Sequence, residues 1–158
     1  MQPIGVVKSP FTDTSQIPKG CGARHEAEGA LVIEPEFEQG LVDIEGFSHL
    51  YVIWLFDRAG GCELLAKPPT DDRVHGVFAT RSPRRPNPIG LTVVRLLGRE
   101  GSRLLVAGVD MLDGTPILDI KPYLSNVPAD DLRRGWLADA ENRKKDRKST
   151  RLNSSHRL

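Results

Sequence analysis

IGLTVVRLLG (residues 89–98) and SRLLVAGVDML (residues 102–112) are two apolar runs separated by a link of three residues, and they decide the fold. Both are rich in Val, Leu and Ile, and so short a link between them favours a β-hairpin. A third run, HLYVIWLF (residues 49–56), is apolar on both faces, which is typical of a central strand. The most apolar segments of the chain therefore predict a β-sheet.

Shorter segments extend this predicted sheet. Further strands are expected at IGVVKS (4–9), EAEGALVIE (26–34), GVFAT (76–80) and TPILDIKPY (115–123). One short helical turn is expected between Glu34 and Phe47, with Leu41 and Ile44 facing inward. Strands that follow one another without intervening helices predict a mainly β fold, a small antiparallel β-barrel rather than a doubly wound α/β domain.

A single α-helix is expected, near the C-terminus. In PADDLRRGWLADAENRKK (128–145), apolar residues recur at helical spacing and Pro128 suits a first turn. The spaced residues are Leu132, Trp136, Leu137 and Ala140. The run from Lys148 to His156 has no apolar periodicity and resembles a stray translated sequence. We therefore expect one domain over residues 1–147 and a disordered or artefactual tail over residues 148–158.

Composition excludes several classes of protein. The net charge is +1, no apolar run is long enough to span a membrane, and the first ten residues do not resemble a signal peptide. We therefore expect a cytoplasmic protein without membrane contact, in which Cys21 and Cys62 are free thiols. Residues 25–57 hold eight acids and no Lys or Arg, whereas residues 73–99 hold six arginines and no acid. The basic segment could hold an anionic partner.

The loop ATRSPRRPNPIG (79–90) concentrates that positive charge. Its three prolines fix backbone angles and exclude a helix, so the loop is stiff before any ligand arrives. Its polar side chains, Arg81, Arg84, Arg85 and Asn87, can donate to carboxylate or phosphate. The alternative is a surface connection whose arginines pair with the acidic half of the protein.

A second polar cluster follows in DMLDGTPILDIKPY (110–123). It places Asp110, Asp113 and Asp119 near Lys121 and Tyr123. Carboxylates there could accept hydrogen bonds from a ligand or take a proton as a general base. The alternative is a β-turn at Asp113 followed by an edge strand, with Lys121 paired to a neighbouring carboxylate.

Motifs for other chemistries are missing from the sequence. There is no phosphate-binding P-loop and no GxGxxG after a strand, so Rossmann-type cofactor binding is not expected. Cys21 and His25 lie four residues apart, but no second pair of ligands matches them, and we expect no metal. No Ser or Cys lies in a nucleophile-elbow motif.

Three segments together carry a family resemblance. EGFSHLYVIWLF (45–56), GVFATRSPRRPNPIGLTVVRLLG (76–98) and GVDMLDGTPILDIKPY (108–123) closely resemble the TsaA/TrmO family of S-adenosylmethionine-dependent tRNA methyltransferases. The resemblance runs from about Ile4 to Tyr123. It implies a small non-Rossmann β-barrel, often a homodimer, that N6-methylates threonylcarbamoyladenosine at position 37 of tRNA(Thr).

The resemblance also implies site residues. The matching positions of the cofactor pocket are Arg81, Leu91, Leu112, Asp113, Gly114 and Thr115. Pro18, Lys19 and Gly20 stand where the family has Pro-Arg-Gln, so only the proline is kept. Asp57, followed by Arg58, stands where the family commonly has a histidine. With these departures, two alternatives stay open: a methyltransferase for another small or nucleic-acid substrate, and a cofactor-sensing or RNA-binding module without catalysis.

The implied reaction needs alignment of donor and acceptor and removal of one proton. Candidates for the proton acceptor are Asp113, Asp119 and Tyr123. Arg81 would meet the cofactor carboxylate, whereas Arg84, Arg85, Asn87 and Lys121 would bind tRNA. Tyr51 and Trp54 could stack on a base, but on an apolar strand they are more often core residues.

Overall fold

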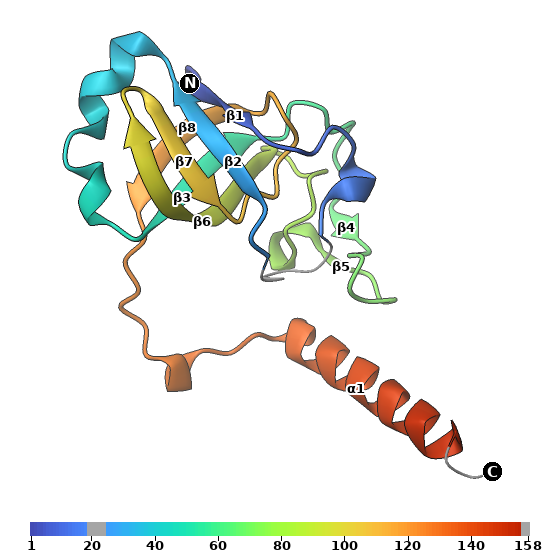
Figure 1. Cartoon of the computed structure of the whole chain (residues 1–158). Coiled ribbons are helices and arrows are strands. Elements are labelled where there is room, and N and C mark those ends of the chain that lie inside the picture. The colour runs from blue at the N-terminus through green and yellow to red at the C-terminus, as the bar shows by residue number, and fades with distance from the viewer. Residues whose placement is uncertain (19–24, 156–158) are drawn as a thin grey trace.

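Six strands close into an antiparallel β-barrel around an apolar core in the computed structural model, which describes residues 1–18 and 25–155 (Figure 1). Around the barrel the order of neighbouring strands is β1, β2, β7, β6, β3 and β8, and β8 pairs with β1 to close it. The strands are β1 (Gly5–Lys8), β2 (Glu28–Ile33), β3 (His49–Leu55), β6 (Ile89–Glu100), β7 (Arg103–Ala107) and β8 (Pro116–Pro122). The predicted fold class is confirmed.

The alternation of side chains in β3 explains why this strand lies at the centre of the sheet. Leu50, Val52 and Trp54 are buried inside the barrel, whereas the residues between them lie on its outer face. β3 pairs with β6 on one side and with β8 on the other, so its backbone is hydrogen-bonded along both edges. The same alternation in β6 buries Gly90, Thr92 and Val94.

Short 3-10 turns cover one part of the barrel wall. The expected helical turn is present as η2 (Pro35–Leu41) and η3 (Ile44–Gly46). Leu41 is buried and Ile44 packs against the core, as predicted. A further turn, η1 (Thr14–Gln16), is capped by Asp13, whose carboxylate accepts the amide hydrogen of Ser15.

The prediction of a strand over residues 76–80 is wrong. Only β4 (Leu65–Ala66) and β5 (His75–Gly76) pair there, as a separate two-stranded sheet, and a 3-10 turn, η4 (Val77–Ala79), follows. The Thr80 amide and hydroxyl both donate to the Val77 carbonyl, at 3.1 and 2.8 Å. This local bonding satisfies the carbonyl that a sheet partner would otherwise need, and the chain turns instead of extending.

The C-terminal helix begins at Trp136 rather than at Pro128. Residues Ala129–Asp131 form a 3-10 turn, η5, and Gly135 has a φ of +54°, which an α-helix does not allow. Leu132 is accordingly exposed instead of lying on the packed face. Helix α1 runs from Trp136 to Ser155 and so includes residues 148–155, which we expected to be a disordered or artefactual tail. That run contains no Pro or Gly, so each added residue extends the helix by one hydrogen bond. The expected domain boundary after residue 147 stays a prediction.

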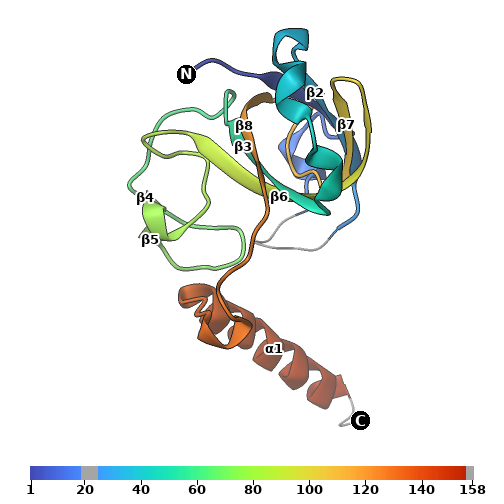
Figure 2. The same cartoon turned by 90° about the vertical axis from the view of Figure 1, so that its left-hand side faces the viewer.

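Helix α1 lies outside the barrel, beside the β4–β5 sheet, in both views (Figures 1 and 2). The Trp136 ring stacks on His75 with ring centroids 4.2 Å apart, and its indole Nε1 donates to the Ala79 carbonyl at 2.8 Å. Arg143 of the helix donates to buried Asp71 at 2.7 Å. Hydrogen bonds from His75 and Arg143 lower the pKa of the Asp71 carboxyl. No helix within residues 1–18 and 25–155 is long and apolar enough to cross a membrane.

Gly90 of β6 allows a steric test of the packing between β3 and β6. A Cβ atom on Gly90 would overlap the indole ring of Trp54, whereas Gly98 of the same strand has open space around it. We expect Gly90→Ala to lower the free energy of unfolding by about 1–3 kcal/mol through overpacking. Gly98→Ala, the matched control, should change it by less than about 0.5 kcal/mol. Urea unfolding followed by Trp fluorescence measures both, and equal effects would contradict this packing.

Candidate functional site

Two hollows meet at the end of the barrel where β3 finishes and β6 begins. The first is a groove of about 430 Å³ and the second a pocket of about 250 Å³. Four residues line both and form the wall between them: Trp54, Phe56, Pro83 and Asp110. The groove is completed by Lys67, Pro68, Pro69, Thr70, Thr80, Arg81, Ser82, Arg85, Ile89, Gly90 and Leu91. The pocket is completed by Thr14, Ile17, Leu55, Asp57, Arg58, Ala59, Gly60, Arg84, Met111, Leu112 and Thr115.

The shared wall carries a partly buried chain of polar groups. The Trp54 indole Nε1 donates to the Thr92 hydroxyl oxygen at 3.0 Å, and that hydroxyl donates to Asp110 Oδ1 at 2.6 Å. Burial raises the pKa of the Asp110 carboxyl, while the Thr92 hydrogen bond and the charges of His25 and Arg81 partly oppose the rise. A carboxylate in such a place is a stronger base than one in water.

The arginine loop, residues 79–90, is tied to its surroundings by backbone hydrogen bonds. The Phe56 amide donates to the Pro88 carbonyl at 2.8 Å, and the Glu63 amide donates to the Arg84 carbonyl at 3.0 Å. Arg85 Nη1 donates to two carbonyls of its own loop, those of Thr80 and Ser82. These bonds add to the stiffness of the prolines and hold the loop over both hollows.

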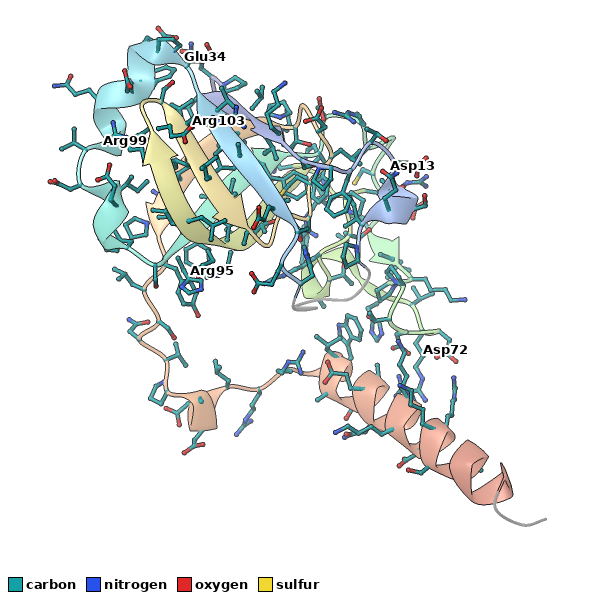
Figure 3. The ribbon with its side chains drawn as sticks, in the orientation of Figure 1. Asp13, Glu34, Asp72, Arg95, Arg99 and Arg103 are labelled. Atoms are coloured by element: carbon teal, nitrogen blue, oxygen red, sulfur yellow. The ribbon has the colours of Figure 1, made fainter. Side chains whose placement is uncertain are left out.

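The loop arginines differ in whether they form ion pairs. Arg84 forms an exposed ion pair with Glu63 at 3.1 Å, and Arg81 takes part in none of the ion pairs among the described residues. The acidic run pairs with β6 instead, through Arg95–Glu26 at 2.6 Å and Arg99–Glu45 at 2.9 Å. Figure 3 labels Arg95 and Arg99 on the barrel, away from the helix.

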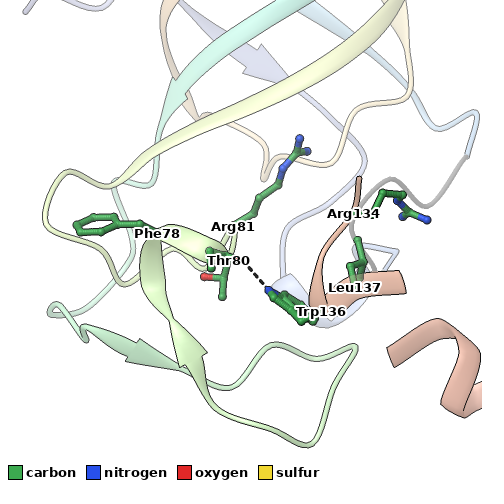
Figure 4. A pocket seen from close by; sticks show the side chains of 7 residues that line it. Phe78, Thr80, Arg81, Arg134, Trp136 and Leu137 are labelled. Carbon is green, nitrogen blue, oxygen red and sulfur yellow. Dashed lines mark hydrogen bonds between the residues drawn. The ribbon is translucent and has the colours of Figure 1, made fainter. Parts of the chain in front are cut away.

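A third hollow, of about 540 Å³, lies between η4 and the start of α1 (Figure 4). It is lined by Phe78, Ala79, Thr80, Arg81, Arg134, Trp136 and Leu137. Arg81 therefore borders this hollow as well as the groove, and in Figure 4 its guanidinium points away from the Trp136 ring.

The structure brings most of the expected cofactor residues to the two hollows. Asp57, Arg58, Leu112 and Thr115 line the pocket, and Arg81 and Leu91 line the groove. Asp113 and Gly114 form the turn behind the pocket, where the Arg58 guanidinium donates to the Asp113 carbonyl. Pro18 follows the pocket residue Ile17 in the chain, whereas Lys19 and Gly20 lie outside the described residues.

Several expected residues lie elsewhere. Lys121 is paired with Asp119 at 3.0 Å on the outer face of β8, as the alternative interpretation of that cluster held. Tyr123 lies beside Tyr51 near the start of β3, with ring centroids 5.1 Å apart, whereas the hollows lie at the end of β3. Asn87 is exposed on the arginine loop and lines neither hollow. In contrast, two other residues expected to bind tRNA do line them: Arg84 lines the pocket and Arg85 lines the groove.

Asp110 is the residue whose place the sequence did not reveal. In the sequence it was one of three carboxylates in a cluster, whereas in the structure it alone of the three lies on the wall between the hollows. The available signal was a carboxylate inside the apolar run SRLLVAGVDML, flanked by Val109 and Met111, both fully buried. Within the described part of the chain no three His, Cys, Asp or Glu side chains are placed to hold a metal; Cys21 lies outside that part.

Comparison with known proteins identifies the barrel. The family model of the tRNA-methyltransferase O N-terminal domain matches residues 6–129. A probable S-adenosyl-L-methionine-binding protein of Pyrococcus abyssi is 48% identical, over 86% of this chain and 74% of that protein. The human tRNA (adenine(37)-N6)-methyltransferase is 36% identical, over 87% of this chain and 33% of that protein.

Solved structures agree with the family model. A crystal structure of TrmO aligns with a TM-score of 0.69 and 42% identity, covering 84% of this chain. TrmO from Pseudomonas aeruginosa aligns with a TM-score of 0.66 and 39% identity, also over 84% of this chain. The chain spans about three fifths of each of these structures, 61% and 60% respectively.

Proposed function

Because the chain belongs to the tRNA-methyltransferase O family of S-adenosylmethionine-dependent tRNA methyltransferases, we propose that it N6-methylates threonylcarbamoyladenosine at position 37 of tRNA(Thr). We place this reaction in the cytoplasm. The observation that carries the proposal is the pair of hollows meeting at Asp110, since the family's motif residues line both of them.

The residues of the hollows fit S-adenosylmethionine. The pocket offers apolar walls from Phe56, Leu55 and Leu112 for an adenine ring, with Arg58 and Thr115 as polar groups. Arg81 in the groove is an exposed guanidinium outside the ion pairs of the described chain, and it suits the carboxylate of the methionine moiety. When bound, the cofactor supplies a methyl group already activated by its sulfonium. The protein then has to align the acceptor and remove its proton.

The tRNA would approach over the arginine loop. Arg84 is exposed at the mouth of the pocket, and Lys67 and Arg85 border the groove. These cations suit phosphate oxygens next to the modified base. Lys121 and Asn87 remain proposed contacts on the outer surface.

We also propose that the protein is a homodimer. The outer face of β6 exposes Leu91, Val93 and Leu97, next to the outward side chains of β3. Through Leu91 this apolar face is continuous with the groove, so a second copy seated on it would cover the cofactor site.

The central test is methyl transfer. Nucleosides from tRNA that carries threonylcarbamoyladenosine should gain one methyl group on incubation with the protein and S-adenosylmethionine, as mass spectrometry would show. Arg81→Ala should weaken cofactor binding by about 10- to 100-fold in calorimetry, because a charge-assisted hydrogen bond is lost. Arg99→Ala, which removes a cation paired with Glu45 and lining neither hollow, is the control and should bind normally.

Other outcomes separate the alternatives. Cofactor binding without a methyl gain on this nucleoside, but with turnover on another acceptor, would favour a different substrate. Binding without turnover on any acceptor would favour a sensing or RNA-binding module. Absence of cofactor binding would refute the proposed function.

Arg84 provides a test of the tRNA surface. Arg84→Ala should weaken tRNA binding and reduce the slope of log affinity against log salt by roughly one, because one phosphate contact is lost. Affinity for S-adenosylmethionine should fall much less than in Arg81→Ala, because the Arg84 guanidinium is exposed and paired with Glu63. Arg99→Ala, which removes a cation paired with Glu45 on the barrel, is the control and should keep the wild-type slope. An unchanged slope in Arg84→Ala would remove this residue from the tRNA surface.

The dimer is tested by placing a charge on the apolar face. Val93→Glu should convert the dimer to a monomer in sedimentation velocity, since a buried unpaired carboxylate opposes association. Val42→Glu, at an exposed position after η2, should remain dimeric. A wild-type chain that sediments as a monomer at all concentrations would contradict the proposal.

A further inference from the structure

We propose that Asp110 is the catalytic base of the methyl transfer, accepting the N6 proton of the acceptor adenine at the junction of the two hollows. This inference rests on the proposed function and names a residue for its chemical step. Asp110 is the only carboxylate among the described residues that lines both the groove and the pocket.

The hydrogen bonds of Asp110 leave it able to accept a proton. Thr92 donates its hydroxyl hydrogen to Oδ1 at 2.6 Å, and no other residue of the described chain donates a side-chain hydrogen bond to this carboxylate. Thr92 is itself fixed by the Trp54 indole, which donates to its oxygen. The chain of donors therefore orients the carboxylate through Oδ1, and the Asp110 amide adds a backbone hydrogen bond to it. An ionised carboxylate has about four lone-pair sites, so capacity remains to accept a proton from a ligand.

The position of Asp110 matches the place where the methyl group must be. Motif residues expected to contact the cofactor lie on both sides of it: Arg58 and Leu112 in the pocket, Arg81 and Leu91 in the groove. A cofactor held by both sets would pass the shared wall, and its sulfonium centre would then lie next to Asp110. A base has to be within hydrogen-bond reach of the proton that it removes.

The other candidates are less suited to this task. The Asp113 carboxylate accepts the Ser9 amide hydrogen at 3.0 Å, in the turn behind the pocket. Asp119 is paired with Lys121 on the outer face of β8, and Tyr123 lies beside Tyr51 near the start of β3. None of the three lines either hollow.

The surroundings of Asp110 favour its role as a base. Burial raises the pKa of its carboxyl, which makes the carboxylate more basic. The Thr92 hydroxyl, His25 and Arg81 act in the opposite direction and favour the ionised form. The further cations are Lys67 and Arg85, which line the groove, and Arg58 and Arg84, which line the pocket. A general base works best when its pKa lies near the working pH, so the rise caused by burial moves the pKa of Asp110 in the favourable direction.

The proposed step balances. The N6–H bond breaks and its proton goes to Asp110, while the nitrogen electron pair forms the bond to the methyl carbon. The bond from sulfur to the methyl carbon breaks and sulfur keeps its electron pair, so S-adenosylhomocysteine forms. The protonated Asp110 then releases its proton to solvent, and no oxidant, reductant or metal is involved.

The first experiment compares Asp110→Asn with the wild-type protein. The variant should bind S-adenosylmethionine and S-adenosylhomocysteine within about threefold of wild type in calorimetry, because its shape and the Thr92 bond are kept. Its single-turnover rate of methyl transfer should fall by about 10²–10⁴-fold, the range for a general base. Asp72→Asn, which removes an exposed carboxylate that pairs with Arg147 and lines neither hollow, is the matched comparison and should keep the wild-type rate.

The other outcomes separate failure of the proposed function from failure of the base assignment. Wild-type protein that transfers no methyl group refutes the proposed function, whatever the variant does. Active wild type with an equally active Asp110→Asn overturns the base assignment alone. A variant that loses affinity for S-adenosylmethionine but not for S-adenosylhomocysteine would make Asp110 an electrostatic partner of the sulfonium, and would also overturn it.

The second experiment uses Thr92 as a positioning residue. Thr92→Val removes a hydrogen bond that lowers the pKa of Asp110, so the acid limb of the pH–rate profile should move to higher pH. Thr92→Ser keeps the hydroxyl and should restore the wild-type limb. Carboxyl ¹³C NMR of the protein alone should show the same shift in one resonance, the one that Asp110→Asn lacks. An unmoved limb and resonance in Thr92→Val would overturn this part of the inference.

Discussion

The contact between Trp54 and Gly90 is the constraint on which the core and the site both depend. The indole ring lies against the bare backbone of Gly90 in the neighbouring strand and packs beside Phe56, with ring centroids 4.1 Å apart. Its apolar face belongs to the barrel core, its edge lines both hollows, and its Nε1 donates to Thr92. One side chain therefore links barrel packing to the orientation of Asp110, and a change in either affects the other.

Most of the barrel could be predicted from the sequence because short runs of apolar and β-branched residues are a local signal. The run from His49 to Phe56 was recognised as apolar on both faces, and the hairpin of β6 and β7 as two apolar runs with a short link. The strand expected at residues 76–80 was wrong because Thr80 bonds back to Val77, a choice that apolar content does not reveal. The helix start was wrong because Gly135 takes a positive φ, although the spacing of apolar residues continues across it.

The candidate site was predictable only in part, for a related physical reason. Motif residues such as Arg81, Arg58 and Thr115 could be named because they stand in the segments that carry the family resemblance. Asp110 acquires its importance from a position between two hollows built by five separate parts of the chain, which no single segment encodes. Conversely, Asp119 and Tyr123 lie close to Asp113 in sequence, but the extended backbone of β8 carries them away from it.

The burial of Asp110 also sets a balance between stability and reactivity. Its pKa is raised in the folded protein, so the folded state holds this proton more tightly than the unfolded chain does. Stability linked to this group is therefore complete at pH below the ordinary carboxyl range and falls as the pH rises through the raised pKa. The Thr92 hydrogen bond limits that loss, and the apolar barrel supplies the remaining stability. A partly buried carboxylate that lines both hollows, and that lowers stability when it ionises, fits a chemical role.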